Sequence, residues 1–211
     1  VILLVALTTV AHADVKHEAT LGSQIRALRT PSANALTGDS LVGPMLGYAH
    51  RLPWRFGKLD LWGTSNLARG FVDGEMFQTL STHVSSVQAA VGVRALYPAW
   101  RDIVLATARI DGGVQRVSVA LADEADHSAS DSGWGATSTA ALGVELAPLW
   151  VDAFAIGIRA ELGYVVTSSI DLDARSEGAP EDTIELDRMA ASLGHLDLGG
   201  RYFSLTILGR F

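Results

Sequence analysis

Apolar and polar side chains alternate along most of this chain. In residues 201–211 one set of alternate positions holds Phe203, Leu205, Ile207, Gly209 and Phe211, and the other holds Tyr202, Ser204, Thr206, Leu208 and Arg210. Successive side chains of a β-strand point to opposite faces, so this pattern predicts a strand with one apolar face. Similar runs predict eight strands, near residues 17–29, 41–52, 58–71, 83–97, 103–120, 134–147, 152–170 and 200–211.

Three short segments that combine proline with tryptophan divide these runs, at residues 52–54, 97–100 and 147–150. Proline cannot donate to a sheet ladder, so each segment predicts a break between two strands. Longer polar stretches, about residues 30–40, 72–82, 121–133 and 171–198, separate the other runs. We therefore expect short turns at one end of the strands and four long loops at the other, with residues 184–198 as a possible extension of the final hairpin.

The two faces of each predicted strand differ in composition. In the run 152–170, Phe154 and Ile156 share one face, whereas Arg159 and Glu161 share the other with small residues such as Gly163. This mixture suits the bore of a narrow barrel, where a large side chain needs a small neighbour. The chain has two lysines, too few for the usual surface of a soluble barrel. We expect the apolar face to meet lipid, with a soluble ligand-binding barrel as the alternative.

This assignment of faces turns a set of charged residues inward, with five acids and five arginines. They are Glu18, Arg26, Arg51, Asp60, Arg94, Arg109, Asp111, Glu145, Arg159 and Glu161. An unpaired buried charge is costly, so a balanced set predicts ion pairs that fill the bore. The alternative is a gated or selective path through it.

Aromatic residues gather at the end with the short turns. Trp54, Tyr97, Trp100 and Trp150 predict a girdle at one membrane interface, and turn packing in a soluble protein is the alternative. Trp62 falls on the inward face of its strand, does not fit this girdle and indicates a local register error.

The first residues read as a targeting segment. Residues 1–10 are apolar, and Ala11-His12-Ala13 resembles a signal peptidase site, so residues 1–13 are expected to be a signal peptide. No basic residue precedes Lys16, which indicates that the start of this peptide is incomplete. A membrane anchor is the alternative, but the apolar stretch has about half of the roughly 20 residues that a spanning helix needs. Residues 14–211 are then one barrel domain.

Composition excludes several functions. Without cysteine there is no disulfide, thiol nucleophile or cysteine metal site. The net charge of −7 argues against nucleic acid as a partner. Two loops are rich in carboxylates, with Asp123, Glu124, Asp126 and Asp131 in one and Asp171, Asp173, Glu177, Glu181, Asp182, Glu185 and Asp187 in the other. Calcium or magnesium sites are an alternative there, but the spacing matches no EF-hand or repeat pattern. We expect solvated exterior loops, no metal and no cofactor.

One candidate for catalysis is the pair His83 and Ser85, which share a face of their strand. This pair weakly resembles the His-x-Ser arrangement of outer-membrane lipid A deacylases. A serine nucleophile also needs a carboxylate to orient its histidine. None lies nearby on that face of the strand, and Glu124 is only a remote candidate. We expect no enzyme, with a lipid A-modifying enzyme as a remote alternative.

The terminal phenylalanine on an alternating run resembles the C-terminal assembly signal of bacterial outer-membrane β-barrels, carried here by Phe203, Leu205, Ile207, Gly209 and Phe211. The whole pattern is similar to the small eight-stranded barrels of the OmpA and OmpX type. This resemblance implies an all-β, antiparallel up-and-down transmembrane β-barrel in the outer membrane of a Gram-negative bacterium. It further implies surrounding outer-membrane lipid, insertion by the barrel-assembly machinery and a monomeric state.

The function expected from this resemblance is a structural or surface-interaction role, with a side-chain-filled lumen and acidic extracellular loops facing an unknown partner. A narrow porin-like channel for ions or small solutes is the alternative.

Overall fold

The computed structural model describes residues 15–29, 40–76, 80–100, 103–123, 128–151, 154–176 and 191–211. The signal peptide expected at residues 1–13 lies outside this part. The strands are β1 (His17–Leu28), β2 (Ser40–Phe56), β3 (Leu59–Met76), β4 (Leu80–Trp100), β5 (Val104–Asp123), β6 (Ser128–Val151), β7 (Phe154–Thr167), β8 (Ile170–Ser176), β9 (Ala191–Leu196) and β10 (Gly200–Arg210).

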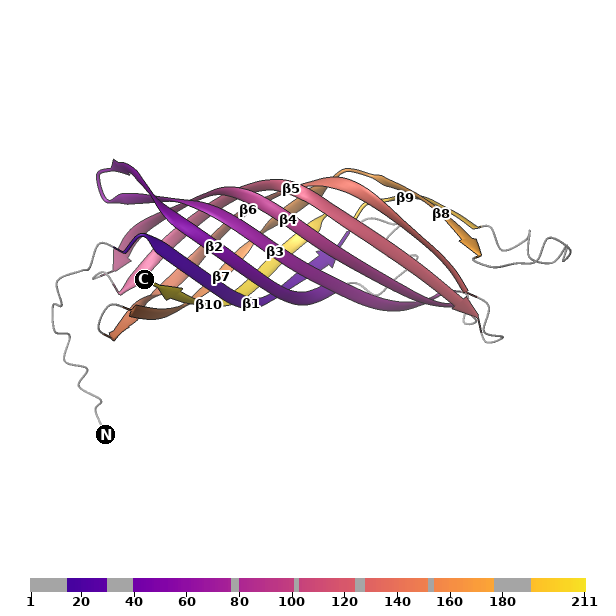
Figure 1. Cartoon of the computed structure of the whole chain (residues 1–211), viewed down its shortest axis with the longest axis horizontal. Helices are drawn as coiled ribbons and strands as arrows, with labels where there is room; N and C mark the ends of the chain where they lie inside the picture. Colours follow the sequence, from indigo (N-terminus) through magenta and orange to yellow (C-terminus); the bar gives the residue numbers. More distant parts are fainter. Residues whose placement is uncertain are drawn as a thin grey trace, which may run out of the picture.

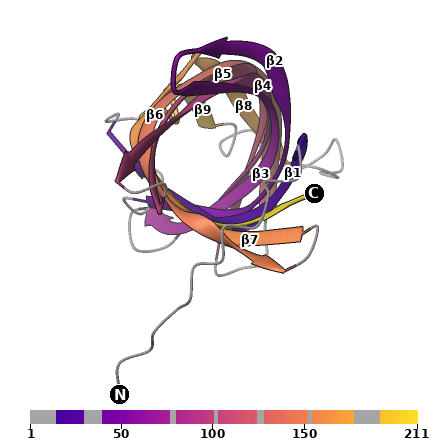
Figure 2. The same cartoon turned by 90° about the vertical axis from the view of Figure 1, so that its left-hand side faces the viewer.

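Eight of these strands close into a barrel (Figures 1 and 2). Their order is β5-β4-β3-β2-β1-β10-β7-β6, β6 pairs again with β5, and every pairing is antiparallel. A path through paired residues that leaves β1 at Ala27 returns to β1 at His17, ten residues earlier. Eight strands with this stagger leave an interior that side chains fill. The predicted fold is confirmed, and all eight predicted runs are barrel strands.

The two ends of the barrel differ. At one end, here called the turn end, Gly57 and Lys58 connect β2 to β3, and Gly57 adopts the positive φ of 62° that suits glycine. The chain also ends there: Phe211 and His17 exchange two backbone hydrogen bonds of 3.0 and 3.1 Å. The opposite end is called the loop end, and β4, β5 and β6 extend toward it with 21, 20 and 24 residues in total (Figure 1). These lengths exceed the 9 to 11 or so residues that span a bilayer.

The proline segments are not the turns themselves, and this expectation was wrong. The strands continue through them, and the pairing register shifts at each one, between Arg51 and Arg55, between Pro98 and Trp100, and between Leu146 and Leu149. At such an irregularity residues lie outside the ladder, as Pro53 and Pro148 do, and this accommodates a residue without an N–H group. The prolines therefore mark bulges, and the turns follow a few residues later.

The expectation of a long loop at residues 171–198 was also wrong where the structure describes this stretch. This stretch contains β8 and β9, which pair with each other from Ile170 and Leu196 onward, and β8 also pairs with the start of β6. Strands likewise occupy much of the expected loops 72–82 and 121–133, because β3 runs to Met76 and β5 to Asp123. The β8–β9 hairpin lies at the loop end (Figure 1).

The wall of the barrel is apolar outside and polar inside. Val91, Ile110 and Leu142 point outward and are 67%, 68% and 70% exposed, whereas Glu18 and Gln115 point inward and are fully buried. This distribution is the reverse of a soluble barrel and suits a wall surrounded by lipid. Among the described residues no helix is long and apolar enough to cross a membrane.

Candidate functional site

Five buried charged residues toward the turn end meet in one ion cluster inside the bore. The carboxylate of Glu18 accepts hydrogen bonds from Arg94 at 2.7 Å, from Arg159 at 2.8 Å and from Nε of Arg210 at 2.9 Å. A second carboxylate, Glu145, accepts from Arg159 at 2.8 Å and lies 2.7 Å from Arg210. All five side chains are buried. We call these residues the Glu18 cluster. They come from β1, β4, β6, β7 and β10, so their contacts connect strands on different sides of the barrel.

Trp62 closes the bore on the turn side of this cluster. Its ring lies 5.8 Å from the guanidinium carbon of Arg94 and 5.2 Å from that of Arg210, within the range of cation–π attraction. It packs with Val15 and Leu96 in a small apolar layer. Trp62 therefore points inward, as its parity in the strand predicted, and the inference of a register error was wrong.

A second group of charges lies nearer the middle of the barrel. Arg109 contacts the carboxylate of Asp111, lies 2.9 Å from that of Glu161 and donates to the hydroxyl of Tyr202 at 3.0 Å. Thr64 donates to Asp111 at 2.9 Å. These five residues, the Arg109 cluster, combine ion pairs and neutral hydroxyl groups around a second set of buried charges.

Arg26 lies toward the loop end and differs from the other arginines of the bore. It donates to the amide oxygens of Gln88 and Gln115, the latter at 3.3 Å, and to the backbone oxygen of Leu198 at 3.5 Å. Within the described part of the chain no carboxylate lies at salt-bridge distance from it. Neutral oxygens thus hold a buried cation here.

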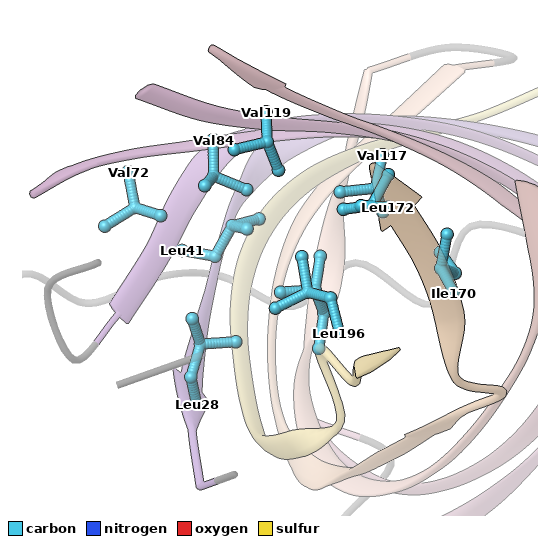
Figure 3. Packing of buried hydrophobic residues seen from close by; sticks show 10 residues of the cluster. Leu28, Leu41, Val72, Val84, Val117, Val119, Ile170, Leu172 and Leu196 are labelled. Atoms are coloured by element: carbon cyan, nitrogen blue, oxygen red, sulfur yellow. The ribbon is translucent and has the colours of Figure 1, made fainter. Parts of the chain in front are cut away.

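An apolar cluster fills the bore at the loop end (Figure 3). We call it the apolar plug. The barrel wall contributes Leu28, Leu41, Val72, Val84, Val117 and Val119, and the β8–β9 hairpin with the short segment after it contributes Ile170, Leu172, Leu196 and Leu198. The hairpin therefore turns its apolar side chains into the barrel instead of into solvent.

The predicted lumen charges lie at different levels along the barrel. Glu18, Arg94, Glu145 and Arg159 belong to the Glu18 cluster, Arg109, Asp111 and Glu161 belong to the Arg109 cluster, and Arg26 lies apart. Arg51 and Asp60 pair with each other at 2.8 Å at the half-exposed turn-end rim. Sequence reasoning left Arg210, Tyr202, Gln88 and Gln115 out of the set. Their inward parity was the signal that could have identified them.

The described side chains of the predicted aromatic girdle and the apolar face of the terminal strand lie on the outer wall. Trp54, Tyr97 and Trp100 are exposed at the turn end, and Trp150 lies at the end of β6, its side chain outside the described part. The face of β10 with Phe203, Leu205, Ile207, Gly209 and then Phe211 points outward. The ring of Phe211 stacks on His17 with centroids 5.8 Å apart.

His83 has a carboxylate partner that the sequence analysis did not identify. Its Nδ1 lies 2.5 Å from Oδ1 of Asp73, which faces it across the β3–β4 pairing. The partner was missed because it is on another strand; Glu124 lies outside the described residues. In the part of the chain that the structure describes, no hydrogen bond joins His83 to Ser85.

The acidic loops are only partly described. Asp171 is exposed on β8 and Asp131 is half-buried on β6. The side chains of Asp123 and Asp173, and the residues Glu124, Asp126, Glu177, Glu181, Asp182, Glu185 and Asp187, fall outside the described part. Among the described residues, no three histidine or carboxylate side chains form a group that could hold a metal ion.

Comparisons with known proteins support the fold. No protein family model and no curated protein sequence matches this chain. Ail, the attachment invasion locus protein of Yersinia pestis, superposes with a TM-score of 0.52 at 10% identity, over 94% of this chain and 100% of Ail. The complex of Ail with the heparin analogue sucrose octasulfate gives 0.53 at 12% identity over the same shares. Neisserial surface protein A gives 0.45 at 11% identity, over 93% of this chain and 94% of its own. This chain therefore has the fold of the small eight-stranded outer-membrane β-barrels.

Proposed function

We propose that this chain is an integral β-barrel protein of the bacterial outer membrane, with a sealed bore and a structural or surface-interaction role at its loop end. The observation that carries this proposal is the reversed polarity of the wall, with exposed Val91 and Leu142 outside and buried Glu18 and Glu145 inside. Outer-membrane lipid would surround the wall. The barrel-assembly machinery would insert the chain as a monomer, with the turn end in the periplasm.

The sealed bore is supported by the succession of layers along it. From the turn end these are the Trp62 layer, the Glu18 cluster, the Arg109 cluster, Arg26 with its two glutamines, and the apolar plug. An ion that crossed the barrel would have to separate charges that hold one another at 2.7 to 2.9 Å. Removing one partner of a buried pair costs about 3 to 5 kcal/mol, so such a passage is strongly disfavoured.

The partner of the loop end would differ from the ligand seen with Ail. Ail was solved with a sulfated heparin analogue, whereas this chain carries a net charge of −7 and many carboxylates in residues 171–187. Like charges repel a polyanion. We propose that acidic loops at this end meet a neutral or basic partner.

Planar-bilayer recording separates the sealed barrel from a porin-like channel. We expect no unitary conductance from the wild type, and none from Arg94→Ala or Glu145→Ala barrels that remain folded. A reproducible unitary conductance in the wild type that changes in either variant would establish the channel instead. Recovery in outer-membrane fractions, with gel mobility that differs between unboiled and boiled samples, tests the membrane barrel itself.

One observation favours the alternative that the chain is a lipid-modifying enzyme: His83 contacts Asp73 on the outer wall. We propose that this contact is a hydrogen bond of the outer surface and that the chain is not an enzyme. His83→Ala should therefore leave the lipid A profile of the host unchanged, as should the control His50→Ala, which changes an exposed histidine at the turn end. A changed profile with His83→Ala alone would support the enzyme.

A further inference from the structure

Two arginines face outward on neighbouring parts of the barrel wall. Arg69 of β3 and Arg116 of β5 are both exposed, and each pairs in register with Val87 of the intervening strand β4. Adjacent strands lie about 4.8 Å apart, so the backbones of the two arginines are about 10 Å apart. Their side chains are long enough to reach one small group lying over β4.

This pair lies at the loop-end border of the apolar wall. Along β4, ten residues separate Val87 from Tyr97, the aromatic residue near the turn end. With a rise of about 3.3 Å per residue and a strand tilt near 40°, this is a height of about 25 Å, equal to the apolar band of an outer-membrane barrel. The outward residues between them on β4 are Ala89, Val91, Val93 and Ala95. The arginines thus stand at the level of lipid headgroups.

The described residues supply no counter-charge for these arginines. Within the described residues no carboxylate lies at salt-bridge distance from Arg69 or Arg116. Arg116 donates to the hydroxyl of Ser132 at 3.1 Å, and the nearby acid on this wall, Asp73, is held by His83. An anion from outside the chain would therefore stabilise a charged arginine at the border of the apolar wall.

Neutral donors lie one step closer to the loop end. Ser85 of β4 pairs with Ser118 of β5, and Ser118 pairs with Ser132 of β6. These three hydroxyl groups form a row beside the arginines on the outer wall. Guanidinium and hydroxyl groups that converge in this way are typical ligands of a phosphate.

An apolar groove lies on the membrane side of the same arginines. It has a volume of about 520 Å³ and crosses β2 to β5, where Leu46, Leu67, Val91 and Val114 border the small residue Gly112. A hydrocarbon chain fits a groove of this lining, because burial of apolar surface is favourable.

We propose that this part of the wall binds one phosphorylated lipid of the leaflet at the loop end. Arg69 and Arg116 hold the headgroup phosphate, Ser85 and Ser118 donate to it, and an acyl chain occupies the groove beside Gly112. This inference rests on the proposed insertion of the barrel in a membrane. It adds a specific lipid site to that function.

The test uses the full chain, folded in detergent, and native mass spectrometry with three probes: phosphatidic acid, the matching diacylglycerol and inorganic phosphate. We expect the barrel to retain phosphatidic acid and to retain little diacylglycerol or inorganic phosphate. Arg69→Gln with Arg116→Gln should weaken phosphatidic acid binding roughly tenfold, as expected for the loss of charge-assisted hydrogen bonds. Gly112→Leu should weaken it by filling the groove.

The matched control is Arg29→Gln with Arg201→Gln, which removes the same charge from exposed arginines of β10 and the segment after β1. It should leave binding nearly unchanged. Equal losses in both double variants would indicate attraction by net charge alone and overturn the site, as would unchanged binding in Arg69→Gln/Arg116→Gln. Gel mobility of unboiled samples separates the two proposals: a wild type that is not a folded barrel overturns both, whereas a folded barrel without lipid preference overturns the lipid site only.

Discussion

The carboxylate of Glu18 lies 2.8 Å from the guanidinium of Arg159, although β10 separates the strands that carry them. The same carboxylate also contacts Arg94 of β4, which lies three strands from β1 in the other direction around the barrel. Because β1 and β10 form the seam between the two ends of the chain, one side chain links this seam to two other strands. The Glu18 cluster therefore stabilises the closed barrel as well as filling it.

Glu18→Gln should destabilise the barrel by about 3 to 5 kcal/mol, since three buried arginines lose a shared negative charge. The matched variant Asp60→Asn removes a charge from the half-exposed pair with Arg51 and should cost no more than about 1 kcal/mol. Urea unfolding of the detergent-folded barrels measures both costs. Similar values for the two variants would contradict a special role of the buried cluster.

Gly92→Ala should destabilise the barrel by about 1 to 3 kcal/mol, because its inward Cβ would collide with the backbone oxygen of Ile110 and the carboxylate of Asp111. The control is Gly112→Ala on the adjacent strand, whose Cβ would point into open space. It should change the unfolding free energy by no more than about 0.5 kcal/mol. If both variants unfold at the same urea concentration, close packing in the bore does not limit stability.

Leu196→Ala should cost about 2 to 5 kcal/mol, because the apolar plug would be left with a cavity where a fully buried side chain now packs. Leu142→Ala shortens a leucine of the outer wall, leaves no internal cavity and should cost less than about 1 kcal/mol. Thermal unfolding of the two variants in the same detergent checks this difference. A small cost for Leu196→Ala would mean that the hairpin does not pack stably in the bore.

The strands could be predicted from sequence because burial has a period of two, which a wall between a polar bore and an apolar exterior imposes on every strand. The residues at which the strands end on the loop side could not be predicted in this way. Beyond Val87 the outward residues of β4 become Ser85, His83 and Ser81, so the apolar alternation disappears while the hydrogen-bonded ladder continues. The sequence therefore indicates the part of the strand that meets lipid and not the part that projects past it.

The parts of the candidate site that could not be predicted all depend on register or on contacts distant in sequence. Arg210 has the inward parity, but its partners Glu18 and Glu145 lie on other strands. The contact of His83 with Asp73 exists only in one alignment of β3 against β4. The apolar plug brings residues near Ile170 and Leu196 against the barrel wall. In the sequence these residues are separated by a long acidic stretch that resembles a loop.

The last prediction concerns Phe211, whose ring points outward at the turn end and is 53% exposed. If the terminal phenylalanine is the assembly signal, Phe211→Ala should lower the amount of folded barrel in the outer membrane several-fold. The purified variant should still fold in detergent with an unfolding free energy within about 1 kcal/mol of the wild type, since an exposed ring stabilises little.

Trp100→Ala is the control, because it removes another exposed aromatic side chain from the same end. Quantification of unboiled, fast-migrating barrel in outer-membrane fractions distinguishes the two roles. A large loss with Phe211→Ala alone supports recognition by the assembly machinery. Equal losses with both variants, or a Phe211→Ala barrel that is unstable in detergent, would instead make Phe211 a structural residue of the β1–β10 seam, where its backbone already pairs with His17.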